Sequence, residues 1–227
     1  MARDIYVLIT HERSGIVREA FNAFHGIRAF SCDIEPAEDG RDDFHIRGDA
    51  VAAMRSRRWD FIGMHPECTY INGAGLHWNN RGRGWEKTEA AVQHVHDCVA
   101  AAGETPYYLE NPVGILSTRW RKPDQTIQPY EFKADASKRT CLWLQGLPIL
   151  KKDPAQRVKG RMVEWPRGSG KMVERWSNQT DSGQNRLAPG EARAMDRART
   201  YPGIAAAMAE QWVLHLLRTV DSLVGRT

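Results

Sequence analysis

Short apolar runs alternate with amphipathic segments along this chain. Residues 5–10 are apolar and rich in β-branched side chains, which predicts a buried first strand, and apolar residues recur at helical spacing over residues 16–24. Further strands are predicted over 28–35 and 61–63. This alternation predicts an α/β fold on a parallel or mixed sheet, with its chemistry at the carboxyl ends of the strands.

The second half of the chain continues the pattern with longer elements. A helix is predicted over Glu86–Ala102 and a strand over 106–109. Residues 128–132 and 138–144 read as a pair of strands. Further helices are predicted over 50–57, 191–199 and 204–224, with Pro202-Gly203 breaking the chain between the last two.

Two predicted strands end on reactive side chains. The strand over 61–63 leads through Pro66 to Cys68 and then into a glycine-containing loop, and the strand over 106–109 ends at Glu110. The carboxyl ends of parallel strands meet at one edge of a sheet, so the thiol and the carboxylate are expected to lie near each other. A thiol and a carboxylate placed in this way can attack a ring and hold it polarised. The alternative for Cys68 is a small buried hydrophobic residue.

The positive charge of the chain is concentrated in one segment. The whole chain carries a formal net charge of +4, whereas residues 151–193 contain ten Lys and Arg and five Asp and Glu, leaving −1 for the remainder. A local excess of this kind favours a surface that binds a polyanion, and a solvated loop is the alternative. The predicted phosphate-binding residues are Arg157, Lys159, Arg161, Arg167 and Lys171. Because the segment is short and rich in Gly and Pro, we expect it to offer little scaffold for reading bases.

Length and cysteine usage limit the class of protein. A chain of 227 residues suits one sizeable domain, and no apolar run approaches the roughly 20 residues of a membrane span. Four separated cysteines without a Cys-x-x-Cys pattern, and a start without a signal peptide, predict reduced thiols and a cytoplasmic protein. His94, His96 and Cys98 lie on one predicted helix but lack a further partner, so no metal site is expected.

Several motifs of this chain resemble those of the cytosine-5 DNA methyltransferases, whose nucleophile lies in a Pro-Pro-Cys loop and whose glutamate lies in Glu-Asn-Val. The nearest resemblance is to small methyltransferase-like proteins of phages and prophages, which implies a bacterial host cell. The matching motifs are His65-Pro66-Glu67-Cys68-Thr69, Glu110-Asn111-Pro112, Lys138-Arg139-Thr140-Cys141-Leu142-Trp143-Leu144 and Tyr201-Pro202-Gly203-Ile204-Ala205.

The resemblance implies a Rossmann-like fold that uses S-adenosylmethionine, with a mixed, mostly parallel sheet and helices on both faces. It divides the chain into a catalytic core over residues 1–150, a small basic nucleic-acid-binding segment over 151–193 in place of a larger recognition domain, and C-terminal helices over 194–227 that pack back on the core. The oligomeric state is left open.

The resemblance also implies a role for each matching residue. Cys68 would attack carbon 6 of a cytosine flipped out of DNA, Glu110 would hold the ring, and Arg139 would hold the carbonyl oxygen of the base. For Asp49 a simple helix N-cap is an alternative to a contact with the adenine of the cofactor. The residues expected at the S-adenosylmethionine site are Thr10, Ser14, Gly15, Asp33, Glu35, Asp49 and Pro66.

Two departures from the family pattern keep other functions open. The Phe-x-Gly-x-Gly cofactor loop is replaced by residues 11–15, and Glu67 replaces the second proline, which puts a carboxylate beside the thiol and disfavours the thiolate. The alternatives are a catalytically impaired relative that binds nucleic acid, and modification of cytosine in a free nucleotide or in RNA. Methylation of adenine would need an Asp/Asn-Pro-Pro-Tyr/Phe loop, which this sequence lacks.

Overall fold

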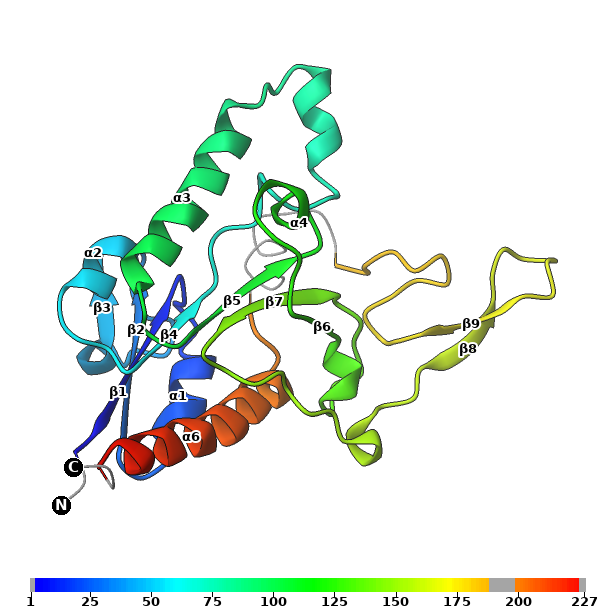
Figure 1. Cartoon of the computed structure of the whole chain (residues 1–227). Helices are drawn as coiled ribbons and strands as arrows, with labels where there is room; N and C mark the ends of the chain where they lie inside the picture. The colour runs from blue at the N-terminus through cyan, green and yellow to red at the C-terminus, as the bar shows by residue number, and fades with distance from the viewer. Residues whose placement is uncertain (1–2, 188–198, 225–227) are drawn as a thin grey trace.

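The computed structural model describes residues 3–187 and 199–224 of the chain, and a single twisted sheet forms its centre (Figure 1). The order of the strands across this sheet is β3-β2-β1-β4-β5-β7-β6. The strands are β1 (Ile5–Thr10), β2 (Ile27–Asp33), β3 (His45–Arg47), β4 (Phe61–Met64), β5 (Tyr107–Pro112), β6 (Gln125–Ile127) and β7 (Thr140–Gln145). Strands β1 to β5 pair in parallel, whereas β7 is antiparallel to both β5 and β6. The predicted mixed, mostly parallel α/β sheet is therefore confirmed.

The direction of the chain across the sheet reverses beside β1. From β1 the chain moves outward to β2 and β3, and it then returns to the other side of β1 to form β4 and β5. Open α/β sheets bind ligands at such a reversal, in the crevice outside the carboxyl ends of the strands. The residues that follow Thr10 in β1 and Met64 in β4 flank this point.

Helices cover both faces of the sheet (Figure 1). They are α1 (Ile16–Asn22), α2 (Ala50–Arg55), α3 (Glu86–Ala102), α4 (Leu116–Arg119) and α6 (Pro202–Val224), with 3-10 helices at Asp42–Phe44, Leu76–Arg81, Pro129–Glu131 and Pro154–Gln156. Alternating side chains of each strand enter two separate cores: Val7 and Ile9 pack with α1 and α6, and Leu8 packs with α2 and α3. Within the described residues no helix is both long and apolar enough to span a membrane.

Aromatic packing ties α6 to the middle of the sheet. The ring of Trp212 is fully buried and stacks on Tyr108 of β5 at 4.9 Å between centroids, and its Nε1 donates a hydrogen bond to the carbonyl of Pro148. The ring of Tyr108 in turn covers Gly63 of β4, where a Cβ atom would lie 2.6 Å from the ring. Gly63 is therefore required by the close approach of Tyr108.

Two predicted boundaries are wrong, in both cases at a proline. The expected strand over 128–132 is instead a 3-10 helix closed by a capping box between Gln128 and Glu131, and β7 pairs with β6. The C-terminal helix begins at Pro202 and not at 204, where its start was predicted. The missing N–H of proline costs nothing at the first helical position.

The basic segment contains a structured element that the sequence analysis did not expect. Strands β8 (Arg161–Glu164) and β9 (Met172–Arg175) form a two-stranded antiparallel hairpin that extends away from the main sheet (Figure 1). At its base Trp176 stacks on Tyr130 with 3.9 Å between ring centroids. The segment therefore has regular structure in this part, whereas the expectation that it offers little scaffold for reading bases stays a prediction. The helix predicted over 191–199 falls, at 191–198, outside the described residues.

Candidate active site

The predicted catalytic pair lies on neighbouring strands at the carboxyl edge of the sheet. Cys68 is partly buried in the loop that follows β4, and Glu110 is buried within the adjacent strand β5, with 8% of its surface exposed. The side-chain nitrogen Nδ2 of Asn111 donates a buried hydrogen bond of 2.8 Å to the carbonyl of Pro66. This bond fastens the loop that carries Cys68 to the strand that carries Glu110.

The loop around Cys68 is held in a defined turn. The carbonyl of Cys68 accepts hydrogen bonds from the backbone and the side chain of Asn72, at 3.0 and 2.8 Å. The loop then pairs with the segment after β5, where a Cβ atom on Gly114 would lie 2.0 Å from the carbonyl oxygen of Ile71. Only glycine fits at this contact, so the thiol is carried by a braced loop.

The carboxylate of Glu67 stands beside the thiol but has a local partner. Its Oε1 accepts a 2.6 Å hydrogen bond from the hydroxyl of Thr69, and the side chain is exposed to solvent. Water and the hydroxyl therefore stabilise its charge on the outer side of the loop. The predicted disfavouring of the thiolate by Glu67 stays a prediction.

Arg139 comes directly before β7, the antiparallel partner of β5, and both Arg139 and Glu110 act electrostatically on the thiol of Cys141. Arg139 is exposed and lines a cavity of about 410 Å³ with Val113, Thr126 and Cys141 near the β6–β7 edge of the sheet. In the described part of the chain, neither Arg139 nor the carboxylate of Glu110 forms a side-chain hydrogen bond or an ion pair. Both groups are thus available to a ligand.

A partly buried histidine near the predicted pair was not assigned a role from the sequence. Nε2 of His65, the residue after β4, lies 2.7 Å from the hydroxyl of Tyr108. Burial, helped by the charge of Lys138, lowers the pKa of His65 to about 3, so the imidazole is neutral at neutral pH. Burial, helped by Glu12 and Glu110, raises the pKa of Tyr108 well above its usual value, so the phenol stays protonated. The signal available in the sequence was the position of His65 directly at the end of the strand.

The N-terminus of α1 is occupied by a side chain of the protein itself. The two carboxylate oxygens of Glu12 accept hydrogen bonds from the backbone N–H groups of Val17 and Arg18, at 2.6 and 3.1 Å. Burial raises the pKa of Glu12 to about 7, against the opposing effect of these bonds. Gly15 at the N-cap has a φ of 72°, which favours glycine. An anionic group of a ligand would therefore have to compete with Glu12 for these amides.

The remaining residues predicted at the cofactor site surround the same edge. Asp33 ends β2, and its Oδ1 accepts a hydrogen bond from the backbone N–H of Glu35 at 3.0 Å. Asp49 caps α2 by accepting from the N–H of Ala52 at 2.8 Å, so the N-cap interpretation is confirmed. Thr10 and Pro66 are buried, and Ser14 and Gly15 lie in the loop between β1 and α1. The contact of each residue with a cofactor stays a prediction.

The predicted phosphate-binding residues divide into two groups. Arg157 forms an ion pair with Glu174, and Arg161 forms one with Asp181 at 2.6 Å, so these two cations are already partly neutralised within the segment. The other three predicted residues are exposed and form no ion pair with any residue that the structure describes. These three are Lys159, Arg167 and Lys171.

The comparisons with known proteins name no family. A scan against models of protein families gives no match, and a search of the curated proteins gives none either. The resemblance to the cytosine-5 methyltransferases therefore depends on the motifs of this chain and on the arrangement of the fold and the site described above.

Proposed function

We propose that this protein transfers a methyl group from S-adenosylmethionine to carbon 5 of cytosine in DNA, through a covalent adduct of Cys68. The observation that carries the proposal is the bond from Asn111 to the carbonyl of Pro66, which holds the thiol loop against the strand of Glu110. It joins two motifs that are far apart in the sequence at the edge of the sheet where ligands of such folds bind.

The chemistry assigned to Cys68 follows from the weak nucleophilicity of cytosine at carbon 5. The thiolate of Cys68 adds to carbon 6, and the ring electrons move to carbon 5, which can then form a bond to an electrophilic carbon. S-adenosylmethionine, when bound, would supply that carbon as a methyl group on a sulfonium centre, with the neutral thioether S-adenosylhomocysteine as the leaving group. Removal of the proton at carbon 5 by a base then allows the Cys68 sulfur to leave as a thiolate, which restores the aromatic ring.

Glu110 supplies the electrostatic part of the mechanism. Its carboxyl group lies in the second half of β5 and has no hydrogen-bond partner in the described part of the chain. We assign it to ring nitrogen 3 and the exocyclic amine of the base, where a proton given by the carboxyl group to nitrogen 3 balances the negative charge that the thiolate brings into the ring. Arg139, which is also without a partner there, is assigned to the carbonyl oxygen of the base.

The residues at the ends of β1 and β2 fit the ribose of S-adenosylmethionine, but they restrict where its carboxylate can bind. The carboxylates of Asp33 and Glu35 are accessible at the end of β2, where such folds hold ribose hydroxyls. Because Glu12 holds the amides at the start of α1, the carboxylate of the methionine part needs other partners. Thr10, Ser14, Gly15, Asp49 and Pro66 complete the proposed site.

The β8–β9 hairpin and its flanks supply the proposed DNA contacts. Lys159, Arg167 and Lys171 are exposed there and would bind phosphates, which supports an affinity that falls with salt. The hairpin has only four residues in each strand, so we expect modification in a short sequence context of about two or three base pairs. The duplex must release the target base for it to reach Cys68.

One observation favours a second function. Glu67 precedes Cys68 in the thiol loop, and a carboxylate beside a thiol is expected to oppose formation of the thiolate. A protein disabled in this way would bind nucleic acid without transferring a methyl group.

Nucleoside mass spectrometry of DNA from cells that express the protein tests the proposal. We expect 5-methylcytosine with the wild type and none with Cys68→Ser. Cys141→Ala is the matched control, because Cys141 is a cysteine of the same chain that lies outside the thiol loop. Absence of 5-methylcytosine with folded wild-type protein would favour the second function, and equal modification by Cys68→Ser would refute the covalent mechanism.

A further inference from the structure

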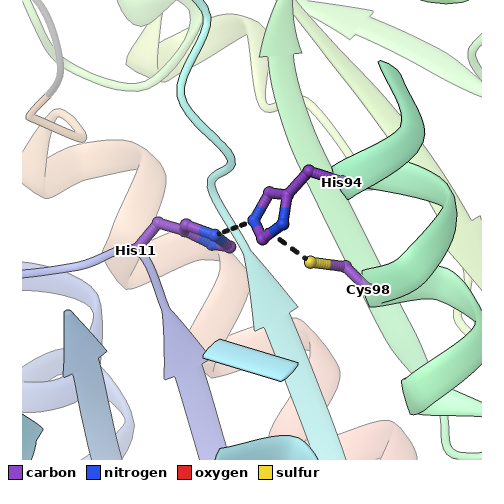
Figure 2. Close-up of side chains that lie close together, drawn as sticks. All are labelled: His11, His94 and Cys98. Carbon is purple, nitrogen blue, oxygen red and sulfur yellow. Dashed lines mark hydrogen bonds between the residues drawn. The ribbon is translucent and has the colours of Figure 1, made fainter. Parts of the chain in front are cut away.

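Three potential metal ligands meet at the reversal point of the sheet. Figure 2 shows the side chains of His11, His94 and Cys98 directed toward one another, the first from the end of β1 and the other two from α3. His94 and Cys98 are one helical turn apart, whereas His11 is 83 residues from His94 in the sequence. The third ligand was therefore not recognisable from the helix alone, which is why no metal was expected.

The distances within this cluster approach those of a tetrahedral site. Nε2 of His94 lies 2.8 Å from Nε2 of His11 and 3.6 Å from Sγ of Cys98, and all three ligand atoms lie within 4.8 Å of one another. Ligand bonds of about 2.05 Å to nitrogen and 2.3 Å to sulfur at a tetrahedral angle separate two nitrogens by about 3.3 Å and nitrogen from sulfur by about 3.6 Å. The distance between His94 and Cys98 already fits, and the two imidazoles need to separate by about half an ångström.

Hydrogen bonds around His11 orient it as a ligand. The hydroxyl of Thr10 donates to the carbonyl of Gly63, so its oxygen accepts from Nδ1–H of His11 at 3.1 Å. This arrangement leaves the lone pair of Nε2 directed into the cluster, as outer-shell partners of metal-bound histidines do. Burial, with His94 and His65 nearby, lowers the pKa of His11 to about 3, so the ring is neutral at neutral pH.

Backbone strain also marks this position. His11 has a φ of 56°, in the left-handed region that side chains other than glycine rarely adopt. Such strain persists where the surrounding structure imposes it, and it concentrates at functional sites. Here the turn at His11 sends its ring toward α3, while the next residue, Glu12, resumes pairing through its N–H to the carbonyl of Cys32.

The charges around the cluster favour a cation. The carboxylate of Asp49 acts electrostatically on both His11 and Cys98, and Asp97 acts on Cys98. Burial and these two acids raise the pKa of Cys98 to about 12, so a metal ion would have to displace the proton of the thiol. A bound cation would neutralise the resulting thiolate and offset the negative potential of Asp49.

We propose that His11, His94 and Cys98 bind one borderline-soft divalent transition metal, Zn²⁺ first of all, and leave a fourth position for water or another ligand. A site with three protein ligands of this kind is typical of zinc centres that keep an open position. The ion would fasten α3 to the end of β1. The three ligands are not among the residues assigned to methyl transfer, although Thr10 and Asp49 neighbour both proposed sites.

Metal titration of the full chain tests the proposal. After removal of metals with a chelator, Zn²⁺ binding is measured by competition with a chromophoric chelator, and Co²⁺ is added as a spectroscopic probe. We expect one metal ion per chain, a thiolate-to-cobalt charge-transfer band, and the intense visible bands of four-coordinate Co²⁺. We also expect Cys98→Ala and His94→Ala each to weaken Zn²⁺ binding by about 100-fold or more, because even partners of ligands can account for 10- to 100-fold.

Two variants serve as controls for this experiment. His96→Ala removes another histidine of α3, whose ring faces Trp120. Cys68→Ser removes the thiol of the candidate active site. Both should keep the cobalt spectrum and the Zn²⁺ affinity of the wild type. Cys98→Ser, which preserves the size of the side chain, guards against misfolding of Cys98→Ala. Absence of stoichiometric Zn²⁺ binding, or an unchanged affinity in folded Cys98→Ser and His94→Ala, would overturn the proposal.

Discussion

Titration of the buried Glu12 should make stability depend on pH in a predictable direction. Its pKa is raised from 4.5 to about 7 in the folded protein, because burial disfavours the charged carboxylate. Between these values the folded state holds the proton more tightly than the unfolded state. The contribution of Glu12 to stability is therefore fully present below pH 4.5 and is lost as the pH rises through 7.

The magnitude follows from the two pKa values. Compared with a side chain that does not titrate, Glu12 lowers the unfolding free energy by about 0.8 kcal/mol at pH 5 and by about 3.3 kcal/mol at pH 8. The difference in unfolding free energy between Glu12→Gln and wild type should thus shift by about 2.5 kcal/mol in favour of the variant over this range. A constant offset remains, because the amide of glutamine satisfies only one of the two N–H groups at the start of α1.

Urea unfolding of both proteins at pH 5 and pH 8, followed by tryptophan fluorescence, measures this shift. His11 and His65 have lowered pKa values and stabilise the fold as the pH rises from about 3 through 6.5, which is the opposite direction. Both proteins share these histidines, so their effect cancels in the difference. A difference that is the same at both pH values would refute the raised pKa of Glu12.

Three further predictions concern the proposed active site and DNA surface. Glu110→Gln should lower kcat for methyl transfer by about 100-fold or more, since an amide cannot give a proton to ring nitrogen 3 as negative charge develops on the ring; an effect confined to KM would indicate binding alone. Asn111→Ala should lower the unfolding free energy by about 1–3 kcal/mol in urea, because the carbonyl of Pro66 loses its partner; unchanged stability would contradict the bracing role. Replacing Lys159, Arg167 and Lys171 by Gln should reduce the slope of log K against log salt for DNA binding by about 3, and an unchanged slope would exclude them as phosphate contacts.

Local patterns predicted the central elements of the fold well. The helix Glu86–Ala102 has the predicted bounds, and the strands at 5–10 and 61–64 lie where apolar runs were found. These segments enter a core that selects apolar side chains at a fixed period, so the pattern records their structure. The parallel arrangement could be predicted because helical segments alternate with the strands, and helices do separate β1, β2, β4 and β5.

Features that depend on distant partners were not predictable in the same way. The three-residue strand β3 is too short to show a period, and it pairs with β2 through residues 31–33. The 3-10 helix at Pro129–Glu131 competes with a strand of similar composition and is decided by its capping box. The partner of Arg157, Glu174, lies 17 residues away, across the β8–β9 hairpin.

The candidate site also combines features that local sequence predicts with features that depend on distant residues. The placement of Cys68 and Glu110 at one edge follows from the ends of two parallel strands, which the sequence indicates. The blocking of the α1 amides by Glu12 depends on where a flexible side chain folds back, and the approach of His11 to α3 depends on a left-handed backbone turn. Neither leaves a periodic signal in the sequence.

The central claim, that Cys68 forms a covalent bond with cytosine, is tested most directly by trapping that bond. The protein is incubated with S-adenosylmethionine and DNA that contains 5-fluorocytosine, in which fluorine replaces the proton that must leave carbon 5, so the adduct cannot resolve. Mass spectrometry of the digested complex should then find the nucleotide on Cys68, and Cys68→Ser should form no adduct. Absence of an adduct with active wild-type protein, or its attachment to Cys32, Cys98 or Cys141, would contradict the account.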